Sequence, residues 1–455
     1  MNPAKDGELL RSALSFAGIA RQNCMMWYEK RVLPGAIILA FLMFAAVIPA
    51  QQLTPHPIHL ANGKNLVLNL PANFTMNVAV QGLKRVRFMA WSPDHRVFAT
   101  DMHDLGDNSL GRVYILGNWD EKTGTFAKVT TYLDHLRNPN NLAFYTEQSQ
   151  DGKPGQSWLY IPLTDKLIRY KYNAGDEAPT GAPEVLAHYP DYGLNYNYGG
   201  WHLTRTIAFA TLHGKTRLYV AVGSSCNVCQ EKEEIRATLS VMDADGSHQE
   251  IVARGLRNAV GMENVPSIDD GALFATNMGA DHLGNGAPED TFFELDSNAR
   301  TVPSGSNYGW PTCYFENGIA HEDHLVSDPK LTDHVVPKPP AGPPPPQFDC
   351  AKIPAVYTTF APHSSPLGLE YFDSGNKSLA DSFLVALHGA SHREIGAGYR
   401  VVRFSAANRK PQDFITGFLV NGKVKGRPCG ILRIGPDAFL LTDDLDGVIY
   451  YVHGS

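Results

Sequence analysis

The sequence predicts an all-β fold, and more specifically a six-bladed β-propeller with four-stranded antiparallel blades. The 455 residues include 41 Gly and 31 Pro, which favour many turns over long helices. A short strand with a central aromatic residue, preceded by a Gly, Asp or Pro turn, recurs along the chain. These aromatic residues follow one another at intervals of 55 to 62 residues, except for one interval of 109; they are Phe98, Tyr160, Tyr219, Phe274, Phe383 and Phe439.

The usual interval matches the length of one blade in a propeller with large blades. Further strands with alternating polarity follow several of the repeats, at residues 111–116, 166–172 and 447–452. A propeller ring must also close between its first and last blades. We therefore expect residues 65–86 to add an outer strand to the blade that contains Phe439.

The long interval contains a Pro-rich stretch, residues 335–350. Proline has no N–H to donate to a sheet, so this stretch cannot form central strands. We interpret it as part of a loop insertion, near residues 320–350, in one blade. A hidden seventh blade is the alternative.

Residues 32–50 are almost all apolar and directly follow Lys30 and Arg31, a pattern typical of an export signal. We therefore expect residues 1–31 to remain cytoplasmic and the propeller domain, residues 60–455, to lie in the periplasm. Two interpretations stay open. Residues 32–50 are either a signal peptide cleaved near Ala50 or an uncleaved anchor in the inner membrane, for which they are just long enough.

The charge balance disfavours one class of partner. The chain has 39 Lys and Arg against 46 Asp and Glu, a net charge of −7, and its body contains no long basic run. Binding to a nucleic-acid backbone requires a concentrated basic surface. We therefore expect no nucleic-acid partner.

The cysteines suggest local cross-links. Cys226 and Cys229 have the spacing of a redox or metal motif, but the chain has neither a second such pair for zinc nor a following His for haem. A local disulfide or buried thiols are the alternative. Cys313 and Cys350 flank the Pro-rich stretch, and a disulfide between them would close it, although sequence alone does not fix pairing.

The candidate chemical groups follow glycines in predicted loops, and propellers carry their functional residues on loops around one mouth of the channel. His202 comes after Gly199 and Gly200, where backbone permits close approach of a ligand. Arg257 and Asn258 offer a fixed cation and an amide to a planar anionic ligand. The alternatives are a structural histidine and an arginine that joins two blades.

A Gly-rich loop at residues 277–290 includes Gly279, Ala280 and several carboxylates. Oxygen ligands of this kind suit Ca²⁺ better than zinc or copper. A plain surface turn is the alternative.

Five segments, taken in order, resemble the soluble glucose and sorbosone dehydrogenases that depend on pyrroloquinoline quinone (PQQ). The resemblance covers roughly residues 80–452, and the segments 388–404 and 426–430 are similar to the L-sorbosone dehydrogenase-like branch. The five segments are residues 200–202, 219–224, 255–261, 279–290 and 307–311.

The resemblance implies a sugar dehydrogenase with PQQ across the channel mouth and Ca²⁺ beside it. By this resemblance His202 is the catalytic base, and Arg257 and Asn258 lie over the reactive quinone carbonyl. Gly279 and Ala280 would offer backbone carbonyls to Ca²⁺. The residues placed around the carboxylates of the cofactor are Arg427, His388 and Arg393.

The chain departs from the glucose-oxidising branch at three points. His202 follows its glycine instead of preceding it, as in the sorbosone-like branch. Ala280 replaces a proline, and a lysine typical of the glucose-oxidising branch is not evident near residue 388.

The predicted substrate is a sugar or a related polyol or aldehyde. The chain has no CxxCH motif for covalent haem, so electrons are expected to pass to an external quinone or cytochrome. Two other functions remain open. One is a propeller lactonase or esterase with a channel metal, which would need inward-facing carboxylates on several blades; the other is a non-catalytic periplasmic binding propeller.

Overall fold

A computed structural model describes residues 52–148, 153–191, 202–299, 302–303, 305–324, 348–390 and 396–455. Within these ranges no helix has the length and apolarity needed to cross a membrane. The predicted export segment, residues 32–50, lies outside the described residues and remains a prediction.

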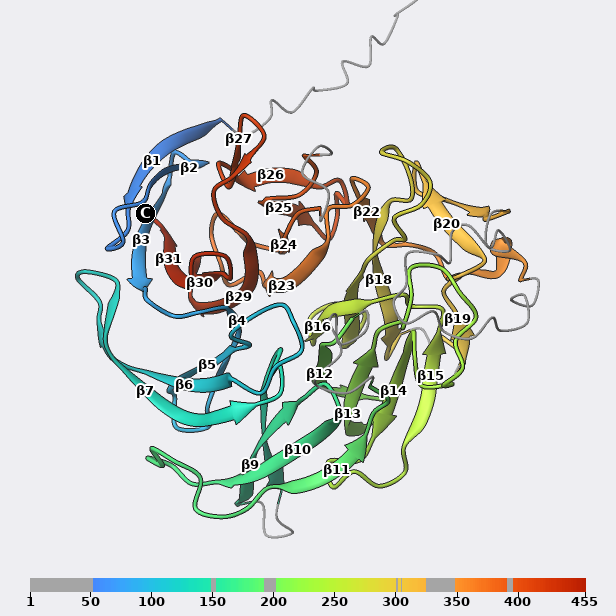
Figure 1. Cartoon of the computed structure of the whole chain (residues 1–455), viewed down its shortest axis with the longest axis horizontal. Coiled ribbons are helices and arrows are strands. Elements are labelled where there is room, and N and C mark those ends of the chain that lie inside the picture. Colours follow the sequence, from blue (N-terminus) through green and yellow to red (C-terminus); the bar gives the residue numbers. More distant parts are fainter. Residues whose placement is uncertain are drawn as a thin grey trace, which may run out of the picture. The chain divides into compact units, whose positions relative to one another are not determined.

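The described residues form six four-stranded antiparallel sheets arranged around one axis, as the sequence predicts (Figure 1). The first strand of each blade is innermost, and the first strands of successive blades contact one another around the ring. In blade order the strands are β4 (Val86–Trp91), β5 (Val97–Asp101), β6 (Gly111–Asp120) and β7 (Thr125–Leu136) in blade 1; β8 (Ala143–Gln148), β9 (Pro154–Pro162), β10 (Lys166–Tyr172) and β11 (Glu184–His188) in blade 2; β12 (Arg205–Leu212), β13 (Lys215–Val222), β14 (Thr238–Met242) and β15 (Glu250–Arg254) in blade 3; β16 (Ala259–Val265), β17 (Ala272–Asn277), β18 (Asp290–Ser297) and β22 (Thr358–Phe360) in blade 4; β23 (Pro366–Phe372), β24 (Ser382–Leu387), β25 (Arg400–Ser405) and β26 (Gln412–Ile415) in blade 5; and β29 (Pro428–Gly435), β30 (Ala438–Asp443), β31 (Val448–Gly454) and β3 (Phe74–Val80) in blade 6.

Blade 6 closes the ring by combining the two ends of the propeller. The N-terminal strand β3 pairs antiparallel with the C-terminal strand β31, with Phe74 opposite Gly454 and Val80 opposite Ile449. The two strands lie side by side in Figure 1, blue against red. The predicted outer strand within residues 65–86 is confirmed.

The repeated aromatic residue lies in the second strand of every blade, and its ring packs against a neighbouring blade. Phe98 contacts Phe144 of blade 2 with ring centroids 5.0 Å apart, and Phe274 contacts Phe383 of blade 5 at 4.9 Å. Aromatic rings bury a large area with few rotatable bonds, which suits the space between flat sheets. The repeat in the sequence is therefore the packing unit of the ring.

The inner strands approach so closely that the structure needs glycine there. A Cβ atom on Gly261, Gly368 or Gly430 would overlap a backbone carbonyl oxygen of the next blade. A threonine hydroxyl also joins neighbouring blades, because Thr276 donates to the Leu367 carbonyl at 3.0 Å and Thr442 to the Arg87 carbonyl at 2.6 Å. The blades are thus held in contact at the axis.

Additional short elements lie beyond the four antiparallel strands of each blade, and one of them, β19 (Ser306–Asn307), adds a parallel fifth strand to the sheet of blade 3. The hairpin of β1 (Leu53–His59) and β2 (Asn65–Pro71) contacts β26, and β27 (Leu419–Val420) pairs with β28 (Lys423–Val424). Blade 4 contains an insertion between β18 and β22, in agreement with the predicted loop. The insertion comprises β19 (Ser306–Asn307), which pairs with β15, the hairpin of β20 (Cys313–Glu316) and β21 (Ile319–Glu322), and the 3₁₀ helix η2 (Cys350–Lys352).

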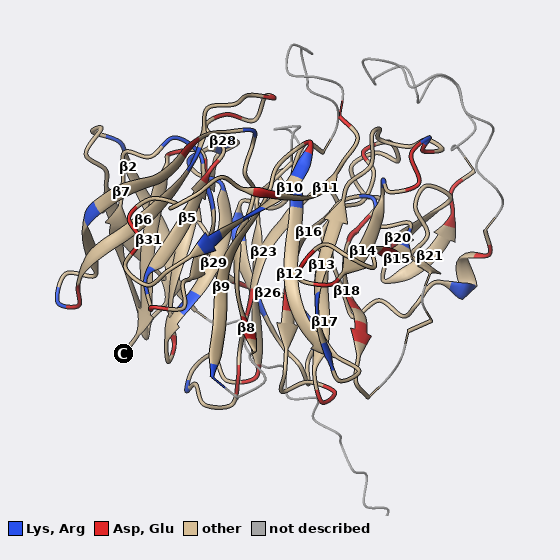
Figure 2. Cartoon of the chain, turned by 90° about the horizontal axis from the view of Figure 1, so that it is seen from below, with Lys and Arg blue, Asp and Glu red and all other residues tan. Residues whose placement is uncertain are grey.

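Disulfides join Cys226 to Cys229 and Cys313 to Cys350, so the local cross-link is confirmed and the second pairing is settled. Cys429 is buried and free. Most of the Pro-rich stretch lies outside the described residues. Acidic and basic residues are interspersed along the side of the propeller (Figure 2).

We predict that closure of the ring by β3 contributes strongly to stability. Phe74 is 1% exposed and packs edge-to-face on Phe414 at 5.0 Å. Phe74→Ala should lower the free energy of unfolding by about 3–5 kcal/mol. Val67 of β2 is 47% exposed, and Val67→Ala should change the free energy of unfolding by no more than about 0.5 kcal/mol. Chemical denaturation measures both, and equal effects would contradict this role for β3.

Candidate functional site

The predicted site residues lie on one face of the ring. In an antiparallel blade whose first strand is innermost, the loop before the first strand and the loop after the second strand open on the same face. His202, Arg257 and Arg427 precede the first strands β12, β16 and β29. Gly279 and His388 follow the second strands β17 and β24. Arg393 lies outside the described residues and remains a prediction.

His202 is held in one tautomer. Its Nδ1 lies 3.0 Å from both the carbonyl oxygen and the Oγ of Ser224. The Ser224 hydroxyl itself donates to the Cys226 carbonyl at 2.7 Å, so both Ser224 oxygens act as acceptors. The proton therefore resides on Nδ1, and the lone pair that can accept another proton is on Nε2.

The environment keeps His202 neutral. Burial lowers the pKa of His202 well below its ordinary value, and the positive charge of Arg257 lowers it further. The nearby carboxylate of Asp281 acts in the opposite direction but more weakly. A neutral imidazole is the form that acts as a base.

Arg257 is a buried cation in a fixed orientation. Its Nη1 donates to the Gly279 carbonyl at 2.7 Å, and its Nε donates to the Asn227 carbonyl at 3.1 Å. Its Nη2 donates to Asn227 Oδ1 at 2.9 Å and lies 3.3 Å from Asp281 Oδ2. Burial lowers the pKa of Arg257, and Asp281 and Asp290 oppose that shift.

Asn258 and His202 lie on either side of Gly223. Its backbone N–H donates to Asn277 Oδ1 at 3.0 Å, and its side-chain Nδ2 donates to Met278 Sδ at 3.3 Å. A Cβ atom on Gly223 would overlap both Asn258 Oδ1 and the His202 side chain. The absence of a side chain at Gly223 therefore lets these two residues approach each other.

The Gly-rich loop is anchored by a buried carboxylate. Asp290 accepts hydrogen bonds from the backbone N–H of Gly279 at 2.7 Å and of Ser365 at 2.8 Å, which links blades 4 and 5. Burial raises the pKa of Asp290 to about 7. The Gly279 carbonyl already accepts a hydrogen bond from Arg257, which leaves its second lone pair for another contact.

Arg427 and His388 come together, as their predicted role requires. Arg427 Nη1 lies 3.2 Å from His388 Nδ1, and Arg427 Nη2 donates to the Ala390 carbonyl at 3.1 Å. The Arg427 guanidinium also lies 5.3 Å from the centroid of the Tyr399 ring. His388 Nε2 is 2.8 Å from Asp444 Oδ1.

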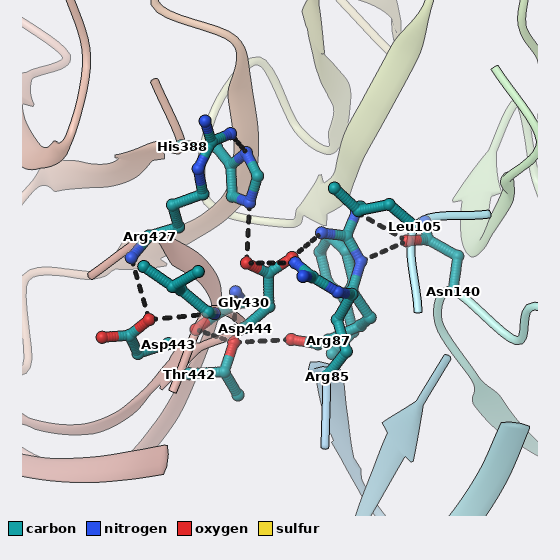
Figure 3. Close-up of polar contacts among 12 residues, drawn as sticks. Arg85, Arg87, Leu105, Asn140, His388, Arg427, Gly430, Thr442, Asp443 and Asp444 are labelled. Carbon is teal, nitrogen blue, oxygen red and sulfur yellow. Dashed lines mark hydrogen bonds and ion pairs between the residues drawn. The ribbon is translucent and has the colours of Figure 1, made fainter. Parts of the chain in front are cut away.

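Asp444 connects this pair to two arginines that sequence reasoning missed (Figure 3). Its Oδ2 is 2.7 Å from Arg87 Nη1, and its Oδ1 is 3.3 Å from Arg85 Nη1. Asn140 Oδ1 accepts from Arg87 Nη2 at 3.1 Å, and Asn140 Nδ2 donates to Thr206 Oγ1 at 2.9 Å. The sequence did contain a signal for Asp444, because this residue directly follows the strand that carries the repeated aromatic residue Phe439, where loops at the mouth begin.

These contacts form a polar belt around the mouth that passes through all six blades. Ser365 O accepts from the backbone N–H of His388 at 3.0 Å, and Ser224 N donates to Arg257 O at 2.8 Å. Thr206 and Ser224 belong to the same blade, where they lie in β12 and directly after β13. The members of the polar belt, in order around the ring, are Arg87, Asn140, Thr206, Ser224, Arg257, Gly279, Asp290, Ser365, His388 and Asp444.

Part of the belt carries an excess of positive charge. Arg85 and Arg87 pair with Asp444, and Arg427 lies against His388 (Figure 3). Asp443 also lies here and accepts from the Arg427 backbone N–H at 2.8 Å, but burial raises its pKa to about 7, which weakens its negative charge. Interactions with His388, Arg87 and Arg85 outweigh burial and hold the pKa of Asp444 far below its ordinary value, so it is ionised. Burial lowers the pKa of His388, which keeps this histidine neutral beside Arg427. This arrangement suits an anionic ligand.

The chain matches one family model. Residues 68–417 match the model described as TrAA12-like. No curated protein matches the sequence.

Solved structures with the same fold are distant in sequence. The PQQ domain of a pyranose dehydrogenase from Coprinopsis cinerea, in its holo form, is 16% identical, with a TM-score of 0.60 over 85% of this chain and 97% of that one. A calcium structure of the carbohydrate-active enzyme family AA12 protein of Trichoderma reesei is 16% identical, with a TM-score of 0.61 over 89% and 98%. The soluble aldose sugar dehydrogenase of Escherichia coli is 13% identical, with a TM-score of 0.52 over 84% and 100%.

The polar belt makes a testable contribution to stability. Asp444→Ala removes the carboxylate from the buried Arg87 and the partly buried Arg85 and should lower the free energy of unfolding by about 3–5 kcal/mol. Asp413 pairs with Arg400 at the surface, with side chains 43% and 37% exposed, so Asp413→Ala should cost no more than about 1 kcal/mol.

The Asp444 contribution should also depend on pH. Because its pKa is depressed in the folded state, the stabilisation is present above the ordinary aspartate pKa of about 3.9 and is lost as the pH falls below it. Denaturation of wild type and Asp444→Ala at pH 7 and pH 3 measures both the size of this stabilisation and its loss at low pH. A difference between wild type and Asp444→Ala that widens on acidification would contradict the assignment.

Proposed function

The chain belongs to the TrAA12-like family, and on that premise we propose that it is a quinoprotein dehydrogenase that oxidises a sugar or related polyol or aldehyde, with PQQ as hydride acceptor. We further propose the sorbosone-like branch as its subgroup. The observation that carries the proposal is a neutral His202 of fixed tautomer beside the fixed cation Arg257, on the mouth of a propeller.

The residues of the mouth fit a ligand with the charge of PQQ. The cofactor is a planar molecule with three carboxylates. The combined positive charge of three arginines is larger than the negative charge of Asp444; they are Arg85, Arg87 and Arg427. Guanidinium groups bind carboxylates in strong, directional hydrogen bonds. Arg427 and His388 would hold carboxylates, and Arg393 is proposed for the same role. Arg257 and Asn258 would lie over the reactive end.

The similar structures support the same substrate class. One is a PQQ domain of a pyranose dehydrogenase and another is an aldose sugar dehydrogenase. A calcium structure exists for a third. We propose that the carbonyl oxygens of Gly279 and Ala280 bind Ca²⁺ here. The Gly279 oxygen would use the lone pair that does not accept from Arg257.

When bound, PQQ supplies an electron-poor carbonyl that accepts the hydride from the substrate carbon. The protein supplies the base. His202 Nε2 takes the proton of the sugar hydroxyl, and the Nδ1 hydrogen bonds to Ser224 stabilise the imidazolium that forms. Arg257 keeps a positive charge at the site without reorganisation, because four hydrogen bonds fix its position.

The electrons would then pass to an external quinone or cytochrome. We propose an exported, periplasmic enzyme whose N-terminal segment either is removed or anchors it to the inner membrane. These proposals rest on residues 1–50 and on the missing haem motif.

A propeller lactonase or esterase is less well supported. This function would need inward-facing carboxylates on several blades. The inner strands surround an axial cavity of about 320 Å³, and the carboxylates that line it, Glu263 and Glu370, come from blades 4 and 5. Among the described residues, the one group of three His, Cys, Asp or Glu side chains close enough to share a metal is Cys226, Cys229 and Glu231. Two of its members form a disulfide and cannot serve as thiolate ligands.

The cofactor requirement is testable by reconstitution. Purified protein supplied with PQQ and Ca²⁺ should reduce an electron-accepting dye with aldoses, ketoses or polyols. Thorough chelation should abolish the activity and Ca²⁺ should restore it. Activity that survives chelation, with no metal found by elemental analysis, would overturn the calcium site. Absence of PQQ binding would overturn the proposed function.

The role of His202 predicts a specific kinetic defect. His202→Ala should retain bound PQQ but lower kcat by about 10²- to 10⁴-fold. Because the pKa of His202 is lowered, the acid limb of wild-type kcat/KM should lie below pH 6.5, with the active base form present above it. Stopped-flow reduction of bound PQQ isolates the chemical step.

Two variants serve as controls. His213→Ala alters a histidine paired with Asp296 on the opposite face and should change nothing. Arg257→Ala should lower both cofactor occupancy and turnover. If His202→Ala reduces its quinone at the wild-type rate, the base must be another residue.

A further inference from the structure

The loop after β13 contains the disulfide between Cys226 and Cys229 and lies directly against Arg257. The disulfide closes a small ring of four residues that includes Asn227 and Val228. Cys226 is fully buried and Val228 is 2% exposed. Because its sulfur atoms are bonded to each other, the pair does not act as a metal site in this state.

Asn227 accepts four hydrogen bonds that define the site. Its carbonyl oxygen accepts from Arg257 Nε at 3.1 Å and from Trp310 Nε1 at 3.0 Å. Its Oδ1 accepts from Arg257 Nη2 at 2.9 Å and from the backbone N–H of Asp281 at 2.9 Å. A single residue thus binds two N–H groups of one guanidinium, those on Nε and Nη2, and also the backbone N–H of Asp281.

The same loop also holds His202. The Cys226 carbonyl accepts the Ser224 hydroxyl, and this orients the Ser224 oxygen that faces His202 Nδ1. Glu231 closes the loop on the other side, where its two carboxylate oxygens accept from the Ser225 N–H and hydroxyl, both at 2.6 Å. The base and the cation therefore depend on one cross-linked segment.

We propose that Asn227 is a positioning residue for Arg257, and that the Cys226–Cys229 disulfide holds Asn227 in the conformation that this requires. Its importance for catalysis rests on the proposed function, since that function gives Arg257 its role. The positioning itself is a property of the protein without cofactor. A short disulfide-closed ring restricts the backbone conformations available to Asn227, so its two acceptors stay aligned.

The first test uses the protein without cofactor. The charged groups that act on His202 are Arg257 and Arg236, which lower its pKa, and Asp281, which raises it. If Arg257 loses its position, the pKa of His202 should rise by about one unit. Titration of ¹³C-labelled histidines by NMR measures it, with the signal assigned by His202→Gln.

The variants for this titration are Asn227→Ala and the double change Cys226→Ser with Cys229→Ser. The matched control removes the other disulfide, by Cys313→Ser with Cys350→Ser, which makes no hydrogen bond to Arg257 in the described residues. An upward shift in the first two but not in the control supports the proposal. No shift, or the same shift in the control, overturns it.

The second test uses the enzyme with PQQ and Ca²⁺. Misplacement of Arg257 should lower kcat of Asn227→Ala by about 10²-fold while the KM for sugar changes little. Asn227→Asp places a carboxylate oxygen where the amide oxygen accepts and should recover most of the loss. Wild-type turnover in Asn227→Ala would overturn the proposal and leave the proposed function standing. If wild type binds no PQQ while the pKa shift is observed, the proposed function fails and the positioning role stands.

Discussion

The closure of the ring by β3 and β31 is the constraint on which the other features depend. Closure forces the six inner strands together at the axis, where glycines such as Gly261 and Gly430 permit direct contact between blades. The loops that precede and follow those strands then converge on one mouth. The polar belt exists because residues from opposite ends of the chain, such as Arg87 and Asp444, are brought within 2.7 Å.

Burial gives the residues of the mouth their chemical character. Each blade contributes between one and three polar groups, which are satisfied by neighbours in the same blade or the adjacent blade. Water is largely excluded from these contacts, so charges act strongly on one another. His202 is consequently neutral. Asp281 is ionised, because a hydrogen bond from His363 and the charge of Arg257 overcome the effect of burial and lower the pKa of Asp281 to about 2.

The sequence predicted the parts of the fold and site that leave a local pattern. Phe98 and its five counterparts mark the second strand of every blade because the same packing problem recurs six times. His202 and Arg257 were found because they follow glycines beside predicted strands, whereas Arg427 was assigned through the family resemblance. Asp444, Arg85 and Asn227 were missed as site residues, because their roles arise from partners distant along the chain. Arg87 and Asp444, for example, are 357 residues apart, and no short motif records such a contact.

The central claim is that the mouth formed by the six blades holds one planar anionic cofactor over His202 and Arg257. Diffraction from crystals of the protein soaked with PQQ and Ca²⁺ tests it most directly. The account predicts electron density for PQQ across the mouth, with its carboxylates on Arg427 and its reactive end beside Arg257 and His202. Density for PQQ bound elsewhere, or a mouth filled by side chains of the protein itself, would contradict it.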